Sequence, residues 1–484
     1  MKTTVIIGSG FSSLASACYM AKAGYKVTVL EKNEQLGGRA SMMEIDGYKF
    51  DMGPSWYWMP DIFERFFADF GKKVSDYYEL EKLSPAYRVV FGENEYIDIE
   101  DTPEKIIETF ERIEPGSGKH LKKFMDEAQE NYRIAMQDLV YNPGLSLLEL
   151  VSVESAKRLN LFVKNISEQV RKEIKNPKLR SILEFPVLFL GAKPNKTPAF
   201  YNFMNHADFG LGTWYPKGGF NAVALGMVKL AKELGVEFHV NEEVIGIDYE
   251  NNQAKKIRTQ NGVYEADVFI SGADYAHTEK LLNGNRNYSE EYWQKKTFAP
   301  SSFLYYVAFN RKVNHLLHHN LFFDTDFEAH AKEIYDTKEL PKQPLFYANF
   351  SSKTDDSLCE EGKEVGFFLI PVAVDLEDNE EIHEKYFQLI LDRIKKCTGE
   401  DLSDAIVFKK SFGVKDFKER YHSCRGNAYG LANTLLQTSV LRPTIKNKKL
   451  KNFFYTGQLT VPGPGVPPAL ISGKVVTDYI LKNN

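Results

Sequence analysis

Near its start the chain changes from a short apolar run, residues 3–7, to an alanine-rich segment across two glycines, Gly8 and Gly10. This pattern predicts a strand, a tight turn and a helix, the opening of a βαβ unit. Gly8 permits the turn, and Gly10 lets a pyrophosphate approach the backbone at the N-terminus of the helix. Ser13 replaces the third glycine of this dinucleotide-binding pattern, so the match is weakened and an ordinary strand-to-helix turn stays an alternative.

A second apolar run, residues 25–30, is predicted to form the next strand and ends at Glu31. About twenty residues after the glycines, a carboxylate at a strand end accepts hydrogen bonds from a ribose. The spacing favours this role for Glu31 over that of a solvated strand end. The βαβ unit therefore predicts a site for a dinucleotide with an unphosphorylated adenosine ribose.

Length and composition set broader limits. A chain of 484 residues that is 43% hydrophobic is long for one domain, so we expect two lobes. A net charge of −5 argues against a nucleic-acid partner. The four cysteines are far apart without a C-x-x-C pair, which indicates neither a metal site nor a disulfide framework and favours a reduced cytosolic protein. A strand close to Met1 leaves no room for a cleavable signal, and no apolar run reaches the ~20 residues of a membrane span.

Residues 60–198 have mostly helical periodicity and predict a helical layer. Within it, residues 155–180 carry eight basic and two acidic side chains beside a stripe formed by Leu159, Val163, Ile166, Val170 and Ile174. A basic amphipathic helix of this kind suits an anionic membrane surface. The alternative is a helix that packs its stripe on the core and exposes its charges to solvent.

The second half returns to strands. Residues 236–240, 243–247 and 268–274 are predicted strands of the nucleotide lobe, and Asp274 suits either a helix N-cap or a cofactor contact. Residues 300–414 are β-rich and predict a sheet of a substrate domain. His318 and His319 are expected on opposite faces of a strand, in structural or surface roles. Residues 453–457 predict a last strand, followed by a Pro-Gly turn and a helix over residues 469–481.

Four further motifs are more specific: the Gly37-Gly38-Arg39 run soon after Glu31, the G-x-x-F-D-x-G-P-S-W segment at residues 47–56, and the turns at residues 215–219 and 462–467. Together they resemble the bacterial phytoene desaturase family of carotenoid enzymes, within the FAD-binding amine-oxidase-like flavoproteins. The similarity extends over nearly the whole chain.

The resemblance implies an α/β fold, with a Rossmann-like FAD-binding domain (residues 1–75, 199–299 and 415–484) interleaved with an α+β substrate and membrane-associating domain (residues 76–198 and 300–414) that carries the helical layer. It implies FAD as cofactor and no metal. The expected cofactor-binding residues are Gly8, Gly10, Phe11, Ser12, Ser13, Glu31, Lys32, Gly37, Gly38, Arg39, Gly53, Pro54, Ser55, Val244, Gly457, Gln458, Gly465 and Val466. The N-terminus of the last helix is expected to face the flavin and to stabilise the negative charge that flavin gains on reduction.

The function implied is that of an FAD-dependent carotenoid desaturase. It would introduce double bonds into phytoene and partly desaturated intermediates towards lycopene by hydride transfer to flavin, with a quinone or oxygen as electron acceptor. No catalytic side chain is assigned. Because the long apolar polyene substrate resides in lipid, we expect a cytoplasmic protein associated peripherally with the membrane surface. The alternatives are a later-step carotenoid 3,4-desaturase or carotenoid isomerase, a flavin amine oxidase, and a non-enzymatic prenyl-binding protein of the same fold.

Overall fold

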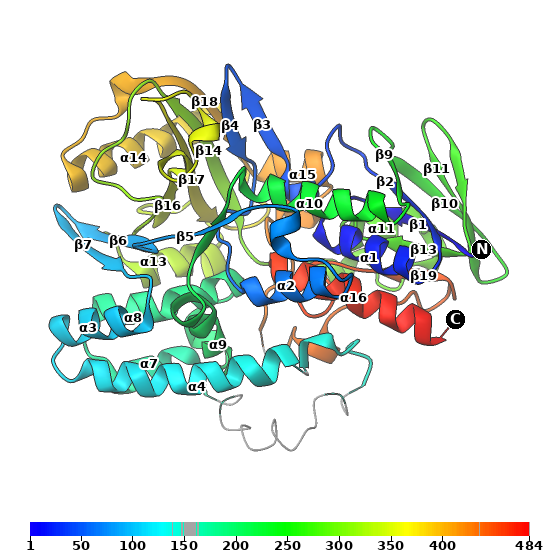
Figure 1. Ribbon diagram of the computed structural model, residues 1–484, viewed down its shortest axis with the longest axis horizontal. Coiled ribbons are helices and arrows are strands. Elements are labelled where there is room, and N and C mark those ends of the chain that lie inside the picture. Colours follow the sequence, from blue (N-terminus) through cyan, green and yellow to red (C-terminus); the bar gives the residue numbers. More distant parts are fainter. Residues whose placement is uncertain (138, 147–148, 150–160, 162–163, 435, 484) are drawn as a thin grey trace.

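The computed structural model describes residues 1–484 except 138, 147–148, 150–160, 162–163, 435 and 484. It has a lobe around a parallel sheet, which lies on the right in Figure 1, and a lobe around a larger mixed sheet on the left. A layer of helices lies below both sheets in this view. The predicted mixture of a Rossmann-like α/β sheet and an α+β part is therefore observed.

The first sheet has the strand order β19-β13-β1-β2-β9, with every neighbouring pair parallel. Its strands are β1 (Thr3–Ile7), β2 (Lys26–Leu30), β9 (Glu237–His239), β13 (Val268–Ser271) and β19 (Phe453–Tyr455). One face packs on the helices α1 (Phe11–Lys22), α10 (Gly219–Glu233) and α16 (Val466–Asn483). The other face packs on the helix α11 (Tyr275–Leu281) and on the antiparallel sheet β10 (Val244–Glu250), β11 (Gln253–Thr259) and β12 (Val263–Glu265). Burial on both faces explains why these strands are almost continuous apolar runs.

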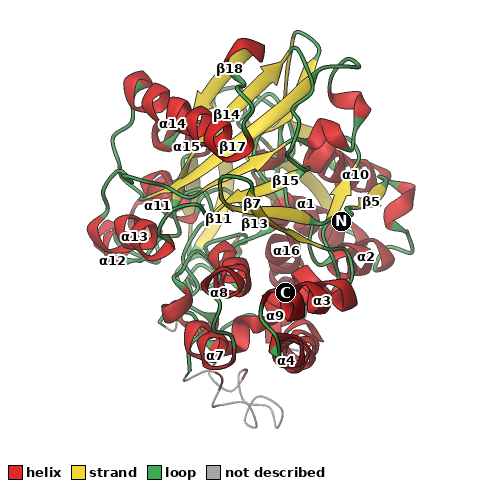
Figure 2. Ribbon diagram, turned by 90° about the vertical axis from the view of Figure 1, so that its left-hand side faces the viewer, coloured by secondary structure: helices red, strands yellow, loops and turns green. Residues whose placement is uncertain are grey.

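The second sheet has the order β18-β14-β17-β16-β15-β6-β7 and is antiparallel except between β15 and β6. Its strands are β6 (Tyr87–Gly92), β7 (Glu95–Ile99), β14 (Ser301–Phe309), β15 (His319–Phe322), β16 (Phe346–Asn349), β17 (Glu364–Val372) and β18 (Ile406–Phe412). Side chains alternate along β14: Phe303 and Tyr305 pack under the helix α14 (Glu380–Thr398), whereas Ser302 and Leu304 face the interior of the molecule. Figure 2 shows α14 and the helix α15 (Val414–Tyr421) lying over these strands.

The remaining elements cover and connect the two sheets. They are the hairpin β3 (Met42–Ile45) and β4 (Tyr48–Asp51), the pair β5 (Leu80–Lys82) and β8 (Trp214–Pro216), and the helices α2 (Pro60–Ala68), α3 (Pro103–Ile113), α4 (Ser117–Gln137), α7 (Ile166–Glu173), α8 (Pro177–Glu184), α9 (Phe203–Asn205), α12 (Glu290–Lys295) and α13 (Phe327–Lys332). Helices α4, α7 and α9 lie at the lower edge of the molecule in both views.

The expectation of a helical layer over residues 60–198 is wrong for residues 80–99, which form β5, β6 and β7. β6 and β7 form a hairpin whose turn contains Asn94 in the left-handed region at φ 53°. Asparagine tolerates that conformation better than most residues do, so residues 92–94 carried a turn signal that the helical interpretation overlooked.

In the basic segment, residues 155–160 and 162–163, with Leu159 and Val163 of the stripe, lie outside the described residues. The described part is two short helices, α7 and α8, that begin at the N-cap residues Asn165 and Asn176. Ile166, Val170 and Ile174 are buried in the main core. The described part of the stripe therefore packs on the protein, as the second interpretation expected.

Two smaller expectations change. The last helix begins at Val466, three residues earlier than predicted, so Pro467 and Pro468 lie in its first turn. The prediction that His318 and His319 point to opposite faces is wrong, because only His319 belongs to β15 and the two rings lie 4.4 Å apart. No helix in the described part of the chain is long and apolar enough to cross a membrane.

Candidate active site

A cavity of about 930 Å³ runs between the two lobes. One end lies at the carboxyl ends of β1 and β2, where open α/β sheets bind their ligands. The other end lies between the second sheet and the helical layer. Of the eighteen predicted cofactor residues, all except Ser13 line this one cavity, although they come from five separate stretches of the chain.

The turn after β1 leaves a space at the N-terminus of α1. Gly8 adopts φ 84° and packs against the backbone of Ala273, so a side chain there would be strained. Gly10 has no atom within 4 Å of the position that a Cβ would take, so the space before the helix is open. No side chain caps α1. Its unpaired N–H groups and the positive end of its dipole thus face the cavity, an arrangement that suits a phosphate group.

Ser13 lies behind the cavity wall and faces β13. A Cβ at Gly272 would collide with the Ser13 hydroxyl, which donates to Ile7 O at 3.5 Å. A third glycine in α1 usually allows the close approach of helix and strand. Here Gly272, just after β13, has no side chain and so leaves the space for Ser13. This placement gives Ser13 a packing role, and it does not reach the cavity.

Glu31 is 4% exposed and holds the phosphate turn in place. One carboxylate oxygen accepts from Ser9 N at 2.9 Å and Ser9 Oγ at 2.6 Å. The other accepts from Asn33 N at 2.9 Å and Asn33 Nδ2 at 3.0 Å. Glu31 lines the cavity, and these four donors occupy the lone pairs of both carboxylate oxygens, so a ribose hydroxyl that binds here takes the place of one of them.

Arg39 brings a positive charge to the cavity. Its Nη2 donates to Ser423 Oγ at 2.6 Å, and its guanidinium lies over the Tyr421 ring at 5.1 Å. Its Nε is buried without a hydrogen-bond partner. Burial lowers the pKa of Arg39, whereas the nearby Tyr421 and Asp274 act in the opposite direction and raise it. An unpaired guanidinium donor at a cavity wall fits an anionic group of a ligand.

The segment after Arg39 is held by close backbone packing. Gly53 lies against Arg39 O, with no space for a side chain, and this contact brings Pro54 and Ser55 to the wall. Asp51, just before it, accepts from Phe220 N and Asn221 N in the first turn of α10 at 2.8 and 3.1 Å. The F-D-x-G-P-S motif is thus explained by a helix cap and a tight approach.

The C-terminal turn closes the cavity opposite α1. Ser472 of α16 accepts from Gly457 N at 2.9 Å, and Ser271 O accepts from Thr456 N at 2.9 Å. Gln458, Gly465 and Val466 line the cavity beside the beginning of α16. In the amide orientation that satisfies both of its groups, Gln458 Oε1 accepts from Arg39 Nη1 and Nη2 at 3.2 and 3.0 Å. The two ends of the chain therefore meet across one space.

Beside Val244, two imidazoles that the sequence did not reveal line the cavity. His277 and His422 stack with ring centroids 3.9 Å apart, and His422 Nε2 lies 2.7 Å from Glu243 Oε1. Asp274 caps α11 by accepting from His277 N, which confirms the N-cap interpretation. Burial lowers the pKa of His277 to about 4. No motif links these residues, because His277 belongs to α11 and His422 follows α15, far along the chain.

The far half of the cavity is apolar. The second sheet contributes Leu304, Leu369, Tyr347 and Leu321, which lie side by side in register on the successive strands β14, β17, β16 and β15. Facing them and closing the walls are Trp56, Trp58, Phe185, Phe200, Phe203, Met204, Phe323 and Phe327. This half of the cavity, which we call the apolar tunnel, suits a long hydrocarbon.

A family model for flavin-containing amine oxidoreductases matches residues 11–481. The chain therefore belongs to the flavin-containing amine oxidoreductases. It is 41% identical to a carotenoid 3,4-desaturase of Haloarcula japonica, over 99% of this chain and 98% of the relative. It is 30% identical to a zeta-carotene-forming phytoene desaturase of Myxococcus xanthus, over 99% and 93% of the two chains. The predicted resemblance to the carotenoid desaturases is confirmed.

Solved structures show the same fold at low identity. An oxidoreductase from Methanosarcina mazei superimposes with a TM-score of 0.62 at 17% identity, covering 99% of this chain and 100% of the other. A putrescine oxidase superimposes with a TM-score of 0.60 at 14% identity, covering 100% and 99%. With the family match, these results make the protein an FAD-dependent oxidoreductase. The open space at Gly10, the uncapped α1 and the unpaired Arg39 Nε all fit FAD.

Proposed function

We propose that the protein desaturates a carotenoid, removing hydrogen from neighbouring carbons of a polyene in the apolar tunnel. The observation that carries the proposal is the continuity of the cavity, which joins the predicted dinucleotide cradle to the tunnel without a wall between them. A substrate bound in the tunnel thus reaches the flavin end directly. The relatives from Haloarcula japonica and Myxococcus xanthus support a carotenoid substrate.

In this proposal Gly10 and the N-terminus of α1 bind the diphosphate, Glu31 binds the adenosine ribose, and Arg39 binds an anionic group. The turn from Gly457 to Val466 borders the flavin ring. When bound, FAD supplies the acceptor for a hydride. One C–H bond of the substrate breaks with its electron pair, a proton leaves the neighbouring carbon, and the two carbons form a double bond.

The protein mainly orients the polyene and excludes water. Conjugation delocalises the positive charge that develops on the substrate, so a strong protein base is not required. Among the described residues that line the cavity, the carboxylates are Glu31, Glu242, Glu243 and Asp274, and all four lie at the nucleotide end. The tunnel thus offers none of these groups to an amine, which disfavours the amine oxidase alternative.

We also propose that the substrate enters from a membrane surface. Leu441 lines the cavity and is 48% exposed, so the cavity opens beside it. Leu145 and Leu436 are exposed too, and Gly144 packs against Ser439 and Val461, which brings residue 145 to the same rim. Lipid tails are as apolar as leucine, so a polyene passes from a bilayer into the tunnel at little cost.

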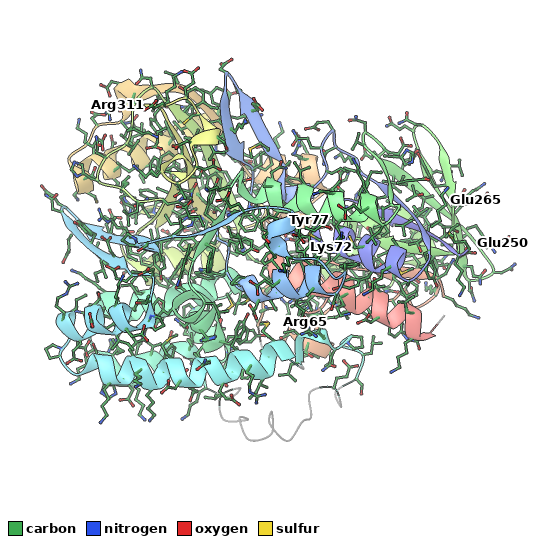
Figure 3. The ribbon with its side chains drawn as sticks, viewed as in Figure 1. Arg65, Lys72, Tyr77, Glu250, Glu265 and Arg311 are labelled. Atoms are coloured by element: carbon green, nitrogen blue, oxygen red, sulfur yellow. The ribbon has the colours of Figure 1, made fainter. Side chains whose placement is uncertain are left out.

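The rim is fixed to the nucleotide lobe by a cation–π contact. The guanidinium of Arg65, on the side of α2 that faces α4, lies 4.1 Å from the centre of the Tyr141 ring (Figure 3). Tyr141 follows Leu139 and Val140, which line the cavity.

Electrons would leave the reduced cofactor for a quinone in the same membrane, or for oxygen.

A second candidate is a later-step 3,4-desaturase that acts on an oxygen-bearing carotenoid. Ser302 is fully buried at the wall of the cavity, and its hydroxyl has no hydrogen-bond partner. The side chains of Tyr335 and Tyr429 line the same region, and burial raises the pKa of Tyr429 to about 12, which the nearby Ser302 hydroxyl opposes. A hydrocarbon leaves such groups unpaired, whereas a hydroxyl pairs with them.

Feeding experiments distinguish the two candidates. FAD-loaded protein is mixed with liposomes that contain either phytoene or a hydroxylated carotenoid, with a quinone as acceptor, and the pigment spectra are followed. Conversion of phytoene supports the early-step desaturase. Conversion of the hydroxylated pigment alone, with loss of that preference in Ser302→Ala, supports the later-step enzyme. No conversion of either, in protein that holds FAD, contradicts the proposal.

A further inference from the structure

Arg442 is a buried cation whose partners are all neutral. It is 4% exposed, and its Nε donates to Thr460 O at 2.7 Å. Its Nη1 donates to Asn433 Oδ1 at 2.6 Å and to Gln437 O at 3.0 Å. Its Nη2 donates to Gln458 O at 2.7 Å and to Leu431 O at 3.3 Å. In the described part of the chain no carboxylate oxygen lies within 4.0 Å of this guanidinium, so its charge has no counter-ion there.

The guanidinium lies directly behind the wall of the flavin end. The turn that it supports contributes Gln458, Leu459, Val461 and Pro462 to the cavity lining, whereas Arg442 itself does not line the cavity. The backbone of this turn and the Asn433 side chain, which accepts from Arg442 and itself lines the cavity, lie between the charge and the cavity. Arg442 therefore does not contact the cofactor, and any effect on it is exerted through the electric field and the shape of the turn.

The surroundings keep the local charge positive. Burial lowers the pKa of Lys296, and the positive charge of the nearby Arg442 lowers it further. Burial lowers the pKa of Arg442 to about 10, so the guanidinium stays protonated at neutral pH. The N-terminus of α16 adds a partial positive charge on the cavity side of the same turn. A buried ion without a partner is costly, and its retention is explained if an anion forms nearby.

We propose that Arg442 is a positioning residue that raises the reduction potential of the bound FAD. Reduction by hydride brings two electrons and one proton, so the flavin ring becomes more negative by one charge. A fixed positive charge in a medium of low dielectric constant stabilises that form relative to the oxidised one. The inference depends on FAD binding and not on which carotenoid is the substrate.

The test compares Arg442→Lys, which keeps the charge but loses most of the hydrogen bonds, with Arg442→Gln, which loses the charge. The midpoint potential of the FAD-loaded protein is measured by photoreduction against reference dyes, without substrate. For R442Q we expect a reduced-to-oxidised ratio at least tenfold lower at fixed potential, which is about 30 mV for a two-electron couple. For R442K we expect a value near that of the unchanged protein. Equal shifts in both variants, or no shift in R442Q, overturn the proposal.

Asn433→Asp covers the case in which R442Q does not fold. This change keeps the side-chain shape and places a carboxylate on Arg442 Nη1, so the cation is neutralised in position. We expect the potential to fall in N433D. The control is Thr434→Asp, which adds the same charge one residue away, at a residue that is not among the hydrogen-bond partners of Arg442, and is expected to change the potential less. An unchanged potential in N433D, or an equal fall in T434D, contradicts the proposal.

Discussion

Gly473 of α16 and Ser12 of α1 lie so close that a Cβ on Gly473 would be 2.5 Å from Ser12 O. The same Cβ would be 2.6 Å from Ala15 Cβ, and Ser16 Oγ donates to Gly473 O at 3.3 Å. This contact joins the first helix of the chain to the last. It sets the spacing between the two helix N-termini that border the cavity, so it couples packing to cofactor binding.

We therefore expect Gly473→Ala to loosen both ends of the cofactor site. Overpacking of this kind costs about 1–3 kcal/mol of the free energy of unfolding. Thermal unfolding with and without FAD, together with the FAD dissociation constant, measures the two effects. Gly284→Ala is the matched control, because a Cβ there meets no atom within 4 Å. If G473A binds FAD as tightly as the unchanged protein, α1 and α16 do not hold a common ligand.

Arg39→Gln should weaken FAD binding by about 10- to 100-fold, because it removes a charge-assisted contact of roughly 1.5–3 kcal/mol. Titration of the apoprotein with FAD, followed by flavin fluorescence, gives the dissociation constant. The control is Arg311→Gln, since Arg311 pairs with Glu400 in the other lobe (Figure 3) and neither residue lines the cavity. Equal affinities in R39Q and R311Q would exclude Arg39 from the site.

Leu369→Trp should block the apolar tunnel without removing the cofactor. Leu369 faces the cavity between Leu304 and Tyr347 on the neighbouring strands, whereas the preceding and following residues of β17 face α14. We expect a flavin spectrum like that of the unchanged protein and loss of most turnover on carotenoid in liposomes. Leu369→Met, which keeps the volume, should retain activity. Full activity in L369W would show that the substrate lies elsewhere.

His330 should make the protein less stable in acid. It is 2% exposed, Leu345 N donates to its Nδ1 at 3.0 Å, and its Nε2 lies 3.0 Å from Pro371 O, an arrangement that needs the neutral ring. Burial lowers its pKa from 6.5 to about 4. As the pH falls, the histidine of the unfolded chain therefore binds a proton before that of the folded protein does. The contribution of His330 to the free energy of unfolding is complete above pH 6.5 and is lost as the pH falls towards 4.

Between pH 7 and pH 5 this group alone should lower the free energy of unfolding by about 2 kcal/mol. Urea unfolding at the two pH values measures the change. In His330→Asn, which has no group that titrates in this range, the difference should shrink by that amount. A variant with the same pH dependence as the unchanged protein would assign the acid sensitivity to other groups.

Much of the nucleotide lobe could be predicted from sequence because its signals are local. A glycine turn after an apolar run specifies β1 and α1, and buried parallel strands appear as unbroken apolar stretches at residues 268–271 and 453–455. The resemblance brought together the residues from Gly8 to Val466, and the structure places all but Ser13 at one cavity.

The rest depends on contacts between distant residues. The space for Ser13 is provided by Gly272, which no spacing rule links to it. Arg442 donates to two backbone carbonyls within the turn at residues 457–462, and every residue has such a carbonyl, so the sequence does not reveal the contact. The contact between His318 and His319 depends on where β15 begins, and strand boundaries are the least certain part of a sequence-based assignment.

The central claim is that one cavity holds FAD and a carotenoid in contact. Its most direct test is anaerobic mixing of FAD-loaded protein with carotenoid-containing liposomes while the flavin and pigment absorbances are recorded together. We expect the oxidised flavin band to bleach as the pigment band moves to longer wavelength, in equal molar amounts, for a single turnover. Flavin that stays oxidised while a convertible carotenoid is present, or pigment that changes without flavin bleaching, would contradict the claim.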